Sequence, residues 1–153
     1  MTGTKIDGKI IAQTVKDRVK KSTSELKKEG INPCLATVLV GNNTASATYV
    51  RNKHKACEEV GIITKDHKLD ENTTQQQLSS IIDELNTDTT VHGILVQLPL
   101  PKHLSEFATT SRISPIKDVD GLTPHNSGLL SMNKAGNSNG RPKKERNCSW
   151  QRR

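Results

Sequence analysis

The sequence contains no apolar run that approaches the roughly 20 residues needed to cross a bilayer. Its first residues, MTGTKIDGKIIAQ, also lack an uninterrupted hydrophobic segment followed by a small-residue cleavage site. We therefore expect a protein that is neither exported nor bound to a membrane. Its expected compartment is the cytoplasm, or the mitochondrial matrix of a eukaryote, although no clear transit peptide is present.

Cysteine is scarce, and neither cysteine nor histidine is spaced as metal sites require. The three cysteines, Cys34, Cys57 and Cys148, are an odd number and form no CxxC pair, which argues against a disulfide framework and a thiolate zinc site. The five histidines lack the i, i+4 spacing that aims two rings at one metal. We expect no metal and a reducing compartment.

The formal charge of +7 is not spread evenly along the chain. Seven basic residues and one acidic residue lie from Ser131 onward, so residues 1–130 are nearly neutral. Residues 131–153 have no sustained helix or strand period, and Trp150 is their only large apolar side chain. The sequence predicts a folded domain over residues 1–130 and a basic, disordered tail over residues 131–153. With one aromatic residue and no nucleic-acid motif, the tail predicts no specific nucleic-acid partner.

Helix and strand patterns alternate through the first part of the chain. Apolar residues recur at three- and four-residue steps in residues 8–29, in residues 45–60, and from Thr73, where Gln76 supplies a capping-box partner. Short stretches at residues 34–40, 62–69 and 91–98 predict strands, and the first and third of them contain apolar runs. This order predicts an α/β fold with a helix-flanked, mainly parallel sheet, because parallel neighbours need crossover helices. Ligands usually bind at the carboxyl ends of such strands, which here are residues 41–46 and 97–101.

Tyr49 and Lys53 are four residues apart in the second predicted helix, so they project from one face. An amine beside an aromatic ring in a cleft can carry protons during catalysis. The same spacing also occurs by chance on exposed helices, and by itself it does not establish a site.

Two polar features follow the third predicted strand. Gln97 ends the apolar run and precedes two prolines, which prevent the ladder from continuing. It is either a ligand-facing amide or a strand residue turned to solvent. The KDVDG segment at residues 117–121 places two carboxylates before a glycine, which is compatible with a simple turn or with a ligand-holding carboxylate.

Together, three segments form a more specific pattern. The stretches VGNNTASATYVRNKHKACEEVGI, HGILVQLPLP and ISPIKDVDGLTPHNSGLL resemble, in order and spacing, the signatures of the bifunctional methylenetetrahydrofolate dehydrogenase/methenyltetrahydrofolate cyclohydrolase family. The resemblance covers Ile6 to Leu130. It implies the N-terminal catalytic domain of that family, which binds folate against a Rossmann domain holding NADP or NAD, and it implies a homodimer.

The resemblance also implies roles for individual residues. Lys53 matches the catalytic lysine that assists attack of water on the methenyl bridge, and Gln97 matches the glutamine that positions this lysine. Tyr49 matches the tyrosine that packs on the folate, and Asp120 matches the aspartate that anchors the pterin ring. The remaining expected substrate-binding residues are Ser46, Pro99 and Leu100.

The sequence departs from the family pattern after Leu130. The last residues contain no predicted strand, no GxGxxG loop and no helix to follow one, so the Rossmann cofactor domain is missing and no NADP or NAD site is expected in this chain. We expect the folate-binding half of an enzyme that oxidises 5,10-methylenetetrahydrofolate to 5,10-methenyltetrahydrofolate and hydrolyses the product to 10-formyltetrahydrofolate. A catalytically idle folate-binding or interaction module is the alternative.

Overall fold

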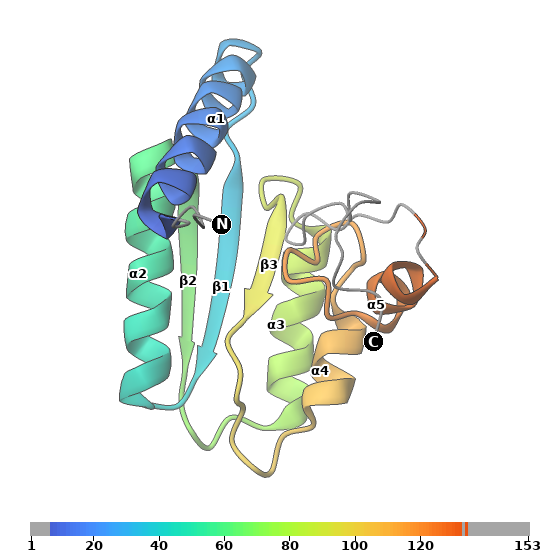
Figure 1. Cartoon of the computed structure of the whole chain (residues 1–153). Helices are drawn as coiled ribbons and strands as arrows, with labels where there is room; N and C mark the ends of the chain where they lie inside the picture. The colour runs from blue at the N-terminus through green and yellow to red at the C-terminus, as the bar shows by residue number, and fades with distance from the viewer. Residues whose placement is uncertain (1–6, 133, 135–153) are drawn as a thin grey trace, which may run out of the picture.

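A computed structural model describes residues 7–132 and residue 134 (Figure 1). The predicted disordered tail lies almost wholly outside these residues. The elements in chain order are α1 (Gly8–Lys28), β1 (Cys34–Val40), α2 (Thr44–Val60), β2 (Ile63–Leu69), α3 (Gln75–Thr87), β3 (Gly93–Val96), α4 (Glu106–Arg112) and α5 (Pro124–Ser131).

The three strands form one parallel sheet in the order β2-β1-β3. Beyond β3, an isolated parallel bridge pairs Ile94 with Asp118, and the Ile94 amide donates to the Lys117 carbonyl oxygen at 2.7 Å. The predicted helix-flanked parallel sheet is confirmed, and the KDVDG segment lies along the outer edge of β3.

The hydrophobic core lies between the sheet and α3. On this face, Ala36 and Val38 of β1 pack with Leu78 and Ile82 of α3, and all four side chains are fully buried. The opposite face of β1 and β2 is covered by α2. The sheet is thus a middle layer, with α2 and α3 on opposite faces.

Several boundaries differ from the sequence predictions. The N-cap of α3 is Thr74, which forms its capping box with Gln77, one residue later than predicted. The strand predicted over residues 91–98 is shorter and spans Gly93–Val96, because Val91 still bonds to the turn at Asp88 and the chain leaves the sheet after the Gln97 amide bonds to Val38. The helices α4 and α5, capped by Ser105 and Thr123, were not predicted.

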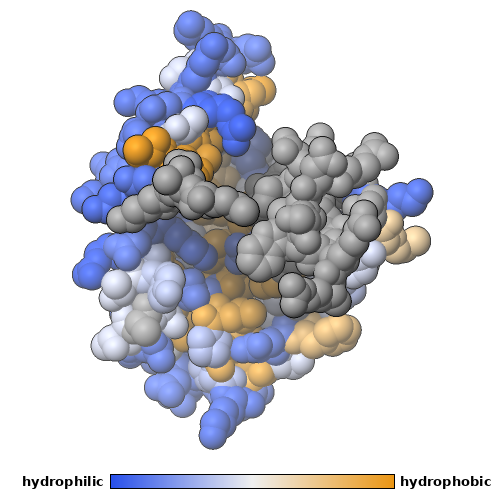
Figure 2. Space-filling view, in the orientation of Figure 1, coloured by the Kyte–Doolittle hydropathy of each residue, from blue (hydrophilic) through white to orange (hydrophobic). Residues whose placement is uncertain are grey.

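Helix α1 follows the predicted amphipathic pattern, but much of its apolar stripe is exposed. Ile10 is 66% exposed and Ile11 53%. Figure 2 shows hydrophobic residues at the surface where α1 lies. Within the described part of the chain α1 packs mainly on α2, and Thr23 is its buried residue. The sequence pattern therefore predicts the helix but does not predict how far its apolar side chains are buried.

Of the helices in residues 7–132, none combines the length and the apolarity that crossing a bilayer requires.

Candidate functional site

The candidate site begins where β1 turns into α2 at the carboxyl edge of the sheet. Gly41 adopts a φ of 81°, a left-handed conformation that favours glycine, and the chain then reaches Asn43. The Asn43 side chain caps α2 by accepting a hydrogen bond from the Ser46 amide at 3.0 Å. This cap fixes the first turn of α2, which carries Ser46 and leads into the turn that carries Tyr49.

Residues from α2 and from the end of β3 line one cavity of about 470 Å³. Its lining residues are Asn43, Ser46, Tyr49, Lys53, Gln97, Leu98 and Pro99. The structure thus brings five of the predicted site residues together. Tyr49 is 65% exposed, so its ring is available to a bound molecule. Asn43 and Leu98 were not predicted, although asparagine just before a helix is a recognisable cap signal.

Gln97 is held by its backbone and has one unpaired side-chain atom. Its amide donates to the Val38 carbonyl oxygen at 2.9 Å, and its Nε2 donates to the Leu98 carbonyl oxygen at 2.7 Å. Its Oε1 is buried and has no hydrogen-bond partner within residues 7–132. No hydrogen bond joins it to Lys53 in the described part of the chain. Because buried polar atoms are nearly always paired, this oxygen is available to a donor entering the cavity.

The two carboxylates of the KDVDG segment lie in different environments. Asp118 is buried and accepts hydrogen bonds from the amides of Leu122 and Thr123 and from Asn126 Nδ2, at 3.2, 2.9 and 3.0 Å. Burial would raise the pKa of Asp118, but these hydrogen bonds outweigh it and hold the pKa below its ordinary value. Asp118 therefore organises the turn that leads into α5.

Asp120, the predicted pterin anchor, does not line the cavity that contains Lys53. It is half-buried, and its carboxylate has no hydrogen-bond partner in the described part of the chain. A carboxylate in this condition remains free to accept hydrogen bonds from a ligand, whereas that of Asp118 is fully engaged. Its assignment to the pterin ring stays a prediction.

Leu100, another predicted site residue, is buried and lines a neighbouring cavity of about 360 Å³. That cavity also contains Gly41, Asn43, Glu71 and Pro99, so it adjoins the first one through Asn43 and Pro99. The Leu100 amide donates to Glu106 Oε1 at 3.1 Å, which fixes the path of the chain after β3. Leu100 therefore lies next to the cavity of Lys53 without lining it, and its role in substrate binding stays a prediction.

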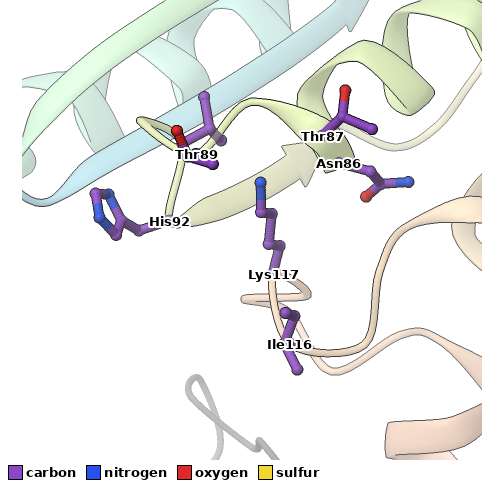
Figure 3. A pocket seen from close by; sticks show the side chains of 7 residues that line it. Asn86, Thr87, Thr89, His92, Ile116 and Lys117 are labelled. Atoms are coloured by element: carbon purple, nitrogen blue, oxygen red, sulfur yellow. The ribbon is translucent and has the colours of Figure 1, made fainter.

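A separate cavity of about 360 Å³ opens near the amino end of β3 (Figure 3). There Lys117 points toward the end of α3, where its Nζ donates to the carbonyl oxygens of Leu85 and Asp88 at 2.9 and 2.7 Å. A lysine in this position satisfies carbonyl groups that a helix end leaves unpaired. We assign Lys117 a structural role, remote from the candidate site.

Two further residues of α2 lie close to Lys53. Cys57 is half-buried, and burial raises its pKa while the nearby charge of Lys53 acts in the opposite direction. His54 bonds to the sheet instead of lining the cavity. Neither residue was singled out from the sequence. Within the residues that the structure describes, no group of three or more His, Cys, Asp or Glu side chains is arranged to hold a metal.

Comparisons with known proteins agree on one family. The family model "Tetrahydrofolate dehydrogenase/cyclohydrolase, catalytic domain" matches residues 6–120. The chain is 78% identical over 135 residues to the Bifunctional protein FolD of Nitrosopumilus maritimus (strain SCM1), a match that covers 88% of this chain and 47% of that protein.

Solved structures give the same result. The FolD methylenetetrahydrofolate dehydrogenase/cyclohydrolase from Campylobacter jejuni is 47% identical with a TM-score of 0.84, over 85% of this chain and 46% of that one. The FolD enzyme from Trypanosoma brucei, solved with NADP cofactor and inhibitor, is 35% identical with a TM-score of 0.81, over 87% of this chain and 46% of that one. The chain thus spans about half the length of the relatives that it matches.

Proposed function

Since the chain belongs to the tetrahydrofolate dehydrogenase/cyclohydrolase family, we propose that it carries the folate-binding catalytic half of an enzyme of one-carbon metabolism. The proposed reactions are oxidation of 5,10-methylenetetrahydrofolate to 5,10-methenyltetrahydrofolate and hydrolysis of that product to 10-formyltetrahydrofolate. The observation that carries the proposal is the cavity that combines Tyr49, Lys53 and Gln97.

The proposed roles follow from the chemistry of these side chains. The exposed Tyr49 ring offers a flat surface on which the folate packs. The amine of Lys53 is the proton carrier of the cavity. The unpaired Gln97 Oε1 accepts a hydrogen bond from this amine or from the attacking water. Ser46, at the first turn of α2, is assigned to the wall of the substrate site.

The hydrolytic step needs a proton carrier that can act twice. As the oxygen of water bonds to the methenyl carbon, one proton of the water passes to the Lys53 amine. The proton then moves to N5 as the bond between that nitrogen and the carbon breaks. The second proton of the water leaves the oxygen to solvent, so that this oxygen becomes the carbonyl of the formyl group on N10. Asp120 would hold the pterin ring while this happens, since an ionised carboxylate accepts hydrogen bonds from amino and ring nitrogens together.

The described residues do not fit the nicotinamide cofactor that the family implies. The loop that follows β1 has a single glycine, and its helix-capping Asn43 already accepts the Ser46 amide. Glu71 lies against Gly41, so a cofactor phosphate at this loop would meet a carboxylate. NADP or NAD is therefore assigned to the part of the relatives that this chain does not match.

The proposal extends to the setting of the protein. Its partner is a folate substrate, and we assign it to a homodimer, as the family resemblance implies. The cytoplasm is the proposed compartment, in keeping with the archaeal and bacterial FolD proteins that the chain matches.

The proposal is tested by hydrolysis of methenyltetrahydrofolate with the purified chain. The loss of substrate absorbance measures the rate. We expect turnover in the wild type, and Lys53→Met should lower it by at least about tenfold, since each tenfold change in rate corresponds to about 1.4 kcal/mol of barrier. Lys68→Met, which removes an exposed lysine on β2, is the matched control and should keep the wild-type rate.

Turnover that Lys53→Met leaves within about threefold would refute the role of the lysine. Folate binding without any turnover would instead favour the idle binding module. Binding without turnover would be seen as a rise of the thermal transition temperature when a folate ligand is added to a chain that hydrolyses no substrate.

A further inference from the structure

Helix α2 has little apolar anchorage on the sheet that it covers. Among its described apolar side chains, only Val50 and Val60 are buried, and they lie in different parts of the helix. Lys53 lies between them. The position of its amine within the cavity therefore depends on what holds the middle of α2.

A polar cluster fills this gap. His54 Nε2 lies 3.1 Å from Thr37 Oγ1 and 2.8 Å from Asp66 Oδ1. Thr37 Oγ1 also donates to the same oxygen of Asp66 at 2.7 Å. Thr37 is 1% exposed, and its register partner across β1 and β2 is Asp66. One imidazole thus ties α2 to both strands beneath it.

The arrangement does not form a nucleophilic triad. In such a triad the hydroxyl and the carboxylate bind different ring nitrogens of the histidine, so that a proton can pass along the chain. Here Thr37 and Asp66 both contact Nε2, and Thr37 donates its hydroxyl proton to the carboxylate. The cluster holds the helix and generates no nucleophile.

Strand β1 connects this cluster with the other side of the catalytic cavity. Thr37 contacts His54, which directly follows Lys53 in the sequence. The next residue of β1, Val38, accepts the Gln97 amide at 2.9 Å. Two adjacent residues of β1 therefore hold the neighbour of Lys53 and the backbone of Gln97.

We infer that His54, held by Thr37 and Asp66, is a positioning residue that sets the place of Lys53 relative to Gln97. Its consequence for hydrolysis rests on the proposed function. Misplacement of a reacting group by about 1 Å can cost about 100-fold in rate. Loss of the cluster should therefore act on kcat through Lys53, while the surfaces that bind folate remain in place.

Two threonines permit a matched comparison. Thr37→Val and Thr109→Val each remove a hydroxyl from a fully buried threonine with little change of shape. Thr109 lies on α4, where its hydroxyl donates to the Ser105 carbonyl oxygen. We expect Thr37→Val to lower kcat about tenfold with KM within about twofold, and Thr109→Val to leave both unchanged at a comparable loss of unfolding free energy.

Two substitutions of His54 complete the kinetic test. His54→Leu should reproduce the loss of kcat, whereas His54→Gln, which keeps an amide near the Nε2 position, should return kcat to within about threefold of wild type. Equal losses in Thr37→Val and Thr109→Val would show that the cluster contributes stability alone. Unchanged kcat in Thr37→Val would overturn the inference outright.

A readout independent of turnover separates this inference from the proposed function. Lysines of the chain can be ¹³C-dimethylated, and the Lys53 NMR signal is identified by its absence in Lys53→Arg. We expect this signal to shift in Thr37→Val and to stay in place in Thr109→Val. If the wild type hydrolyses no folate, the proposed function fails while this comparison still decides the positioning role. An unmoved Lys53 signal in Thr37→Val would contradict it.

Discussion

The two carboxylates of the KDVDG segment show how much the role of one residue depends on its surroundings. Asp118 accepts hydrogen bonds from two backbone amides and from Asn126, whereas Asp120 has no such partner in the described part of the chain. Asp118→Asn should lower the free energy of unfolding by about 2–3 kcal/mol, because charged hydrogen-bond acceptors are lost in a buried site. Asp120→Asn should change it by less than about 0.5 kcal/mol. Urea unfolding measures both.

In folate binding we expect the opposite order, with a larger effect of Asp120→Asn than of Asp118→Asn. Asp120→Asn should weaken a folate ligand by about 1.5–3 kcal/mol in a calorimetric titration, as expected for lost charge-assisted hydrogen bonds. Unchanged affinity would remove Asp120 from the site. Asp118→Asn, measured at a temperature where it is fully folded, is the control for a disturbed turn.

The lowered pKa of Asp118 predicts how its contribution depends on pH. The unfolded chain binds this proton near the ordinary value of 3.8, and the folded chain binds it at lower pH. The stability that the carboxylate contributes is thus fully present above pH 3.8 and is lost as pH falls through the folded pKa. The difference in unfolding free energy between wild type and Asp118→Asn should be constant from about pH 5 to 7 and shrink below about pH 4. A difference that does not depend on pH would contradict this assignment.

The sequence predicted which residues belong to the candidate site but did not predict their contacts. Tyr49 and Lys53 share a helix face, and this follows from helical periodicity alone. That Asp118 is buried while Asp120 is not depends on the bridge to Ile94, which pairs residues distant in sequence. The role of His54 depends on strand register, which a single sequence does not encode locally.

At the scale of elements, the contact between β3 and the KDVDG segment depends on a missing side chain. A Cβ on Gly93 would lie 2.5 Å from Val119 Cγ1, so Gly93→Ala must shift Val119, which lies between Asp118 and Asp120. We expect a loss of about 1–3 kcal/mol of unfolding free energy, together with weaker folate binding. Thermal unfolding and calorimetry measure these effects.

A matched control for this substitution lies in α5. A Cβ on Gly128 would meet nothing within 4 Å, so Gly128→Ala should be neutral or should stabilise the chain by up to about 1 kcal/mol. The double variant Gly93→Ala/Val119→Ala should recover part of the loss, since it removes the opposing methyl group. If Gly93→Ala is as stable as wild type, the close approach does not constrain the segment.

The success of the sequence predictions differs between elements. The long helices were found because their apolar period is sustained over many residues. Strand β1 was found as a short apolar run with β-branched residues. The short helices α4 and α5 were missed, since seven or eight residues carry too little periodicity and their caps, Ser105 and Thr123, are common in turns. The end of β3 was placed too late because Leu98 is a further apolar residue after Gln97, whose amide makes the bond to Val38 of β1.

For the whole molecule, we expect no reduction of NADP or NAD by this chain with methylenetetrahydrofolate. The basic side chains of residues 131–153 can attract phosphates, but charge alone cannot hold a nicotinamide ring against a substrate carbon, and the rate depends on that placement. Cofactor absorbance with saturating folate checks this, with the NADP-binding dehydrogenase-cyclohydrolase of Trypanosoma brucei as a positive control. Reduction above the blank that Lys53→Met abolishes would show that the chain binds the cofactor productively.

The order of the strands also bears on self-association of the protein. Within the described residues β2 pairs with β1 alone, so its other side is an open edge of the sheet. An exposed edge strand can pair with a strand of another molecule, and charged side chains on the edge commonly prevent such pairing. The middle of β2 reads Lys65, Asp66, His67 and Lys68. A second copy that approached edge to edge in an antiparallel arrangement would bring lysines close to lysines, so a homodimer of this protein should form through a surface other than a continuous intermolecular sheet.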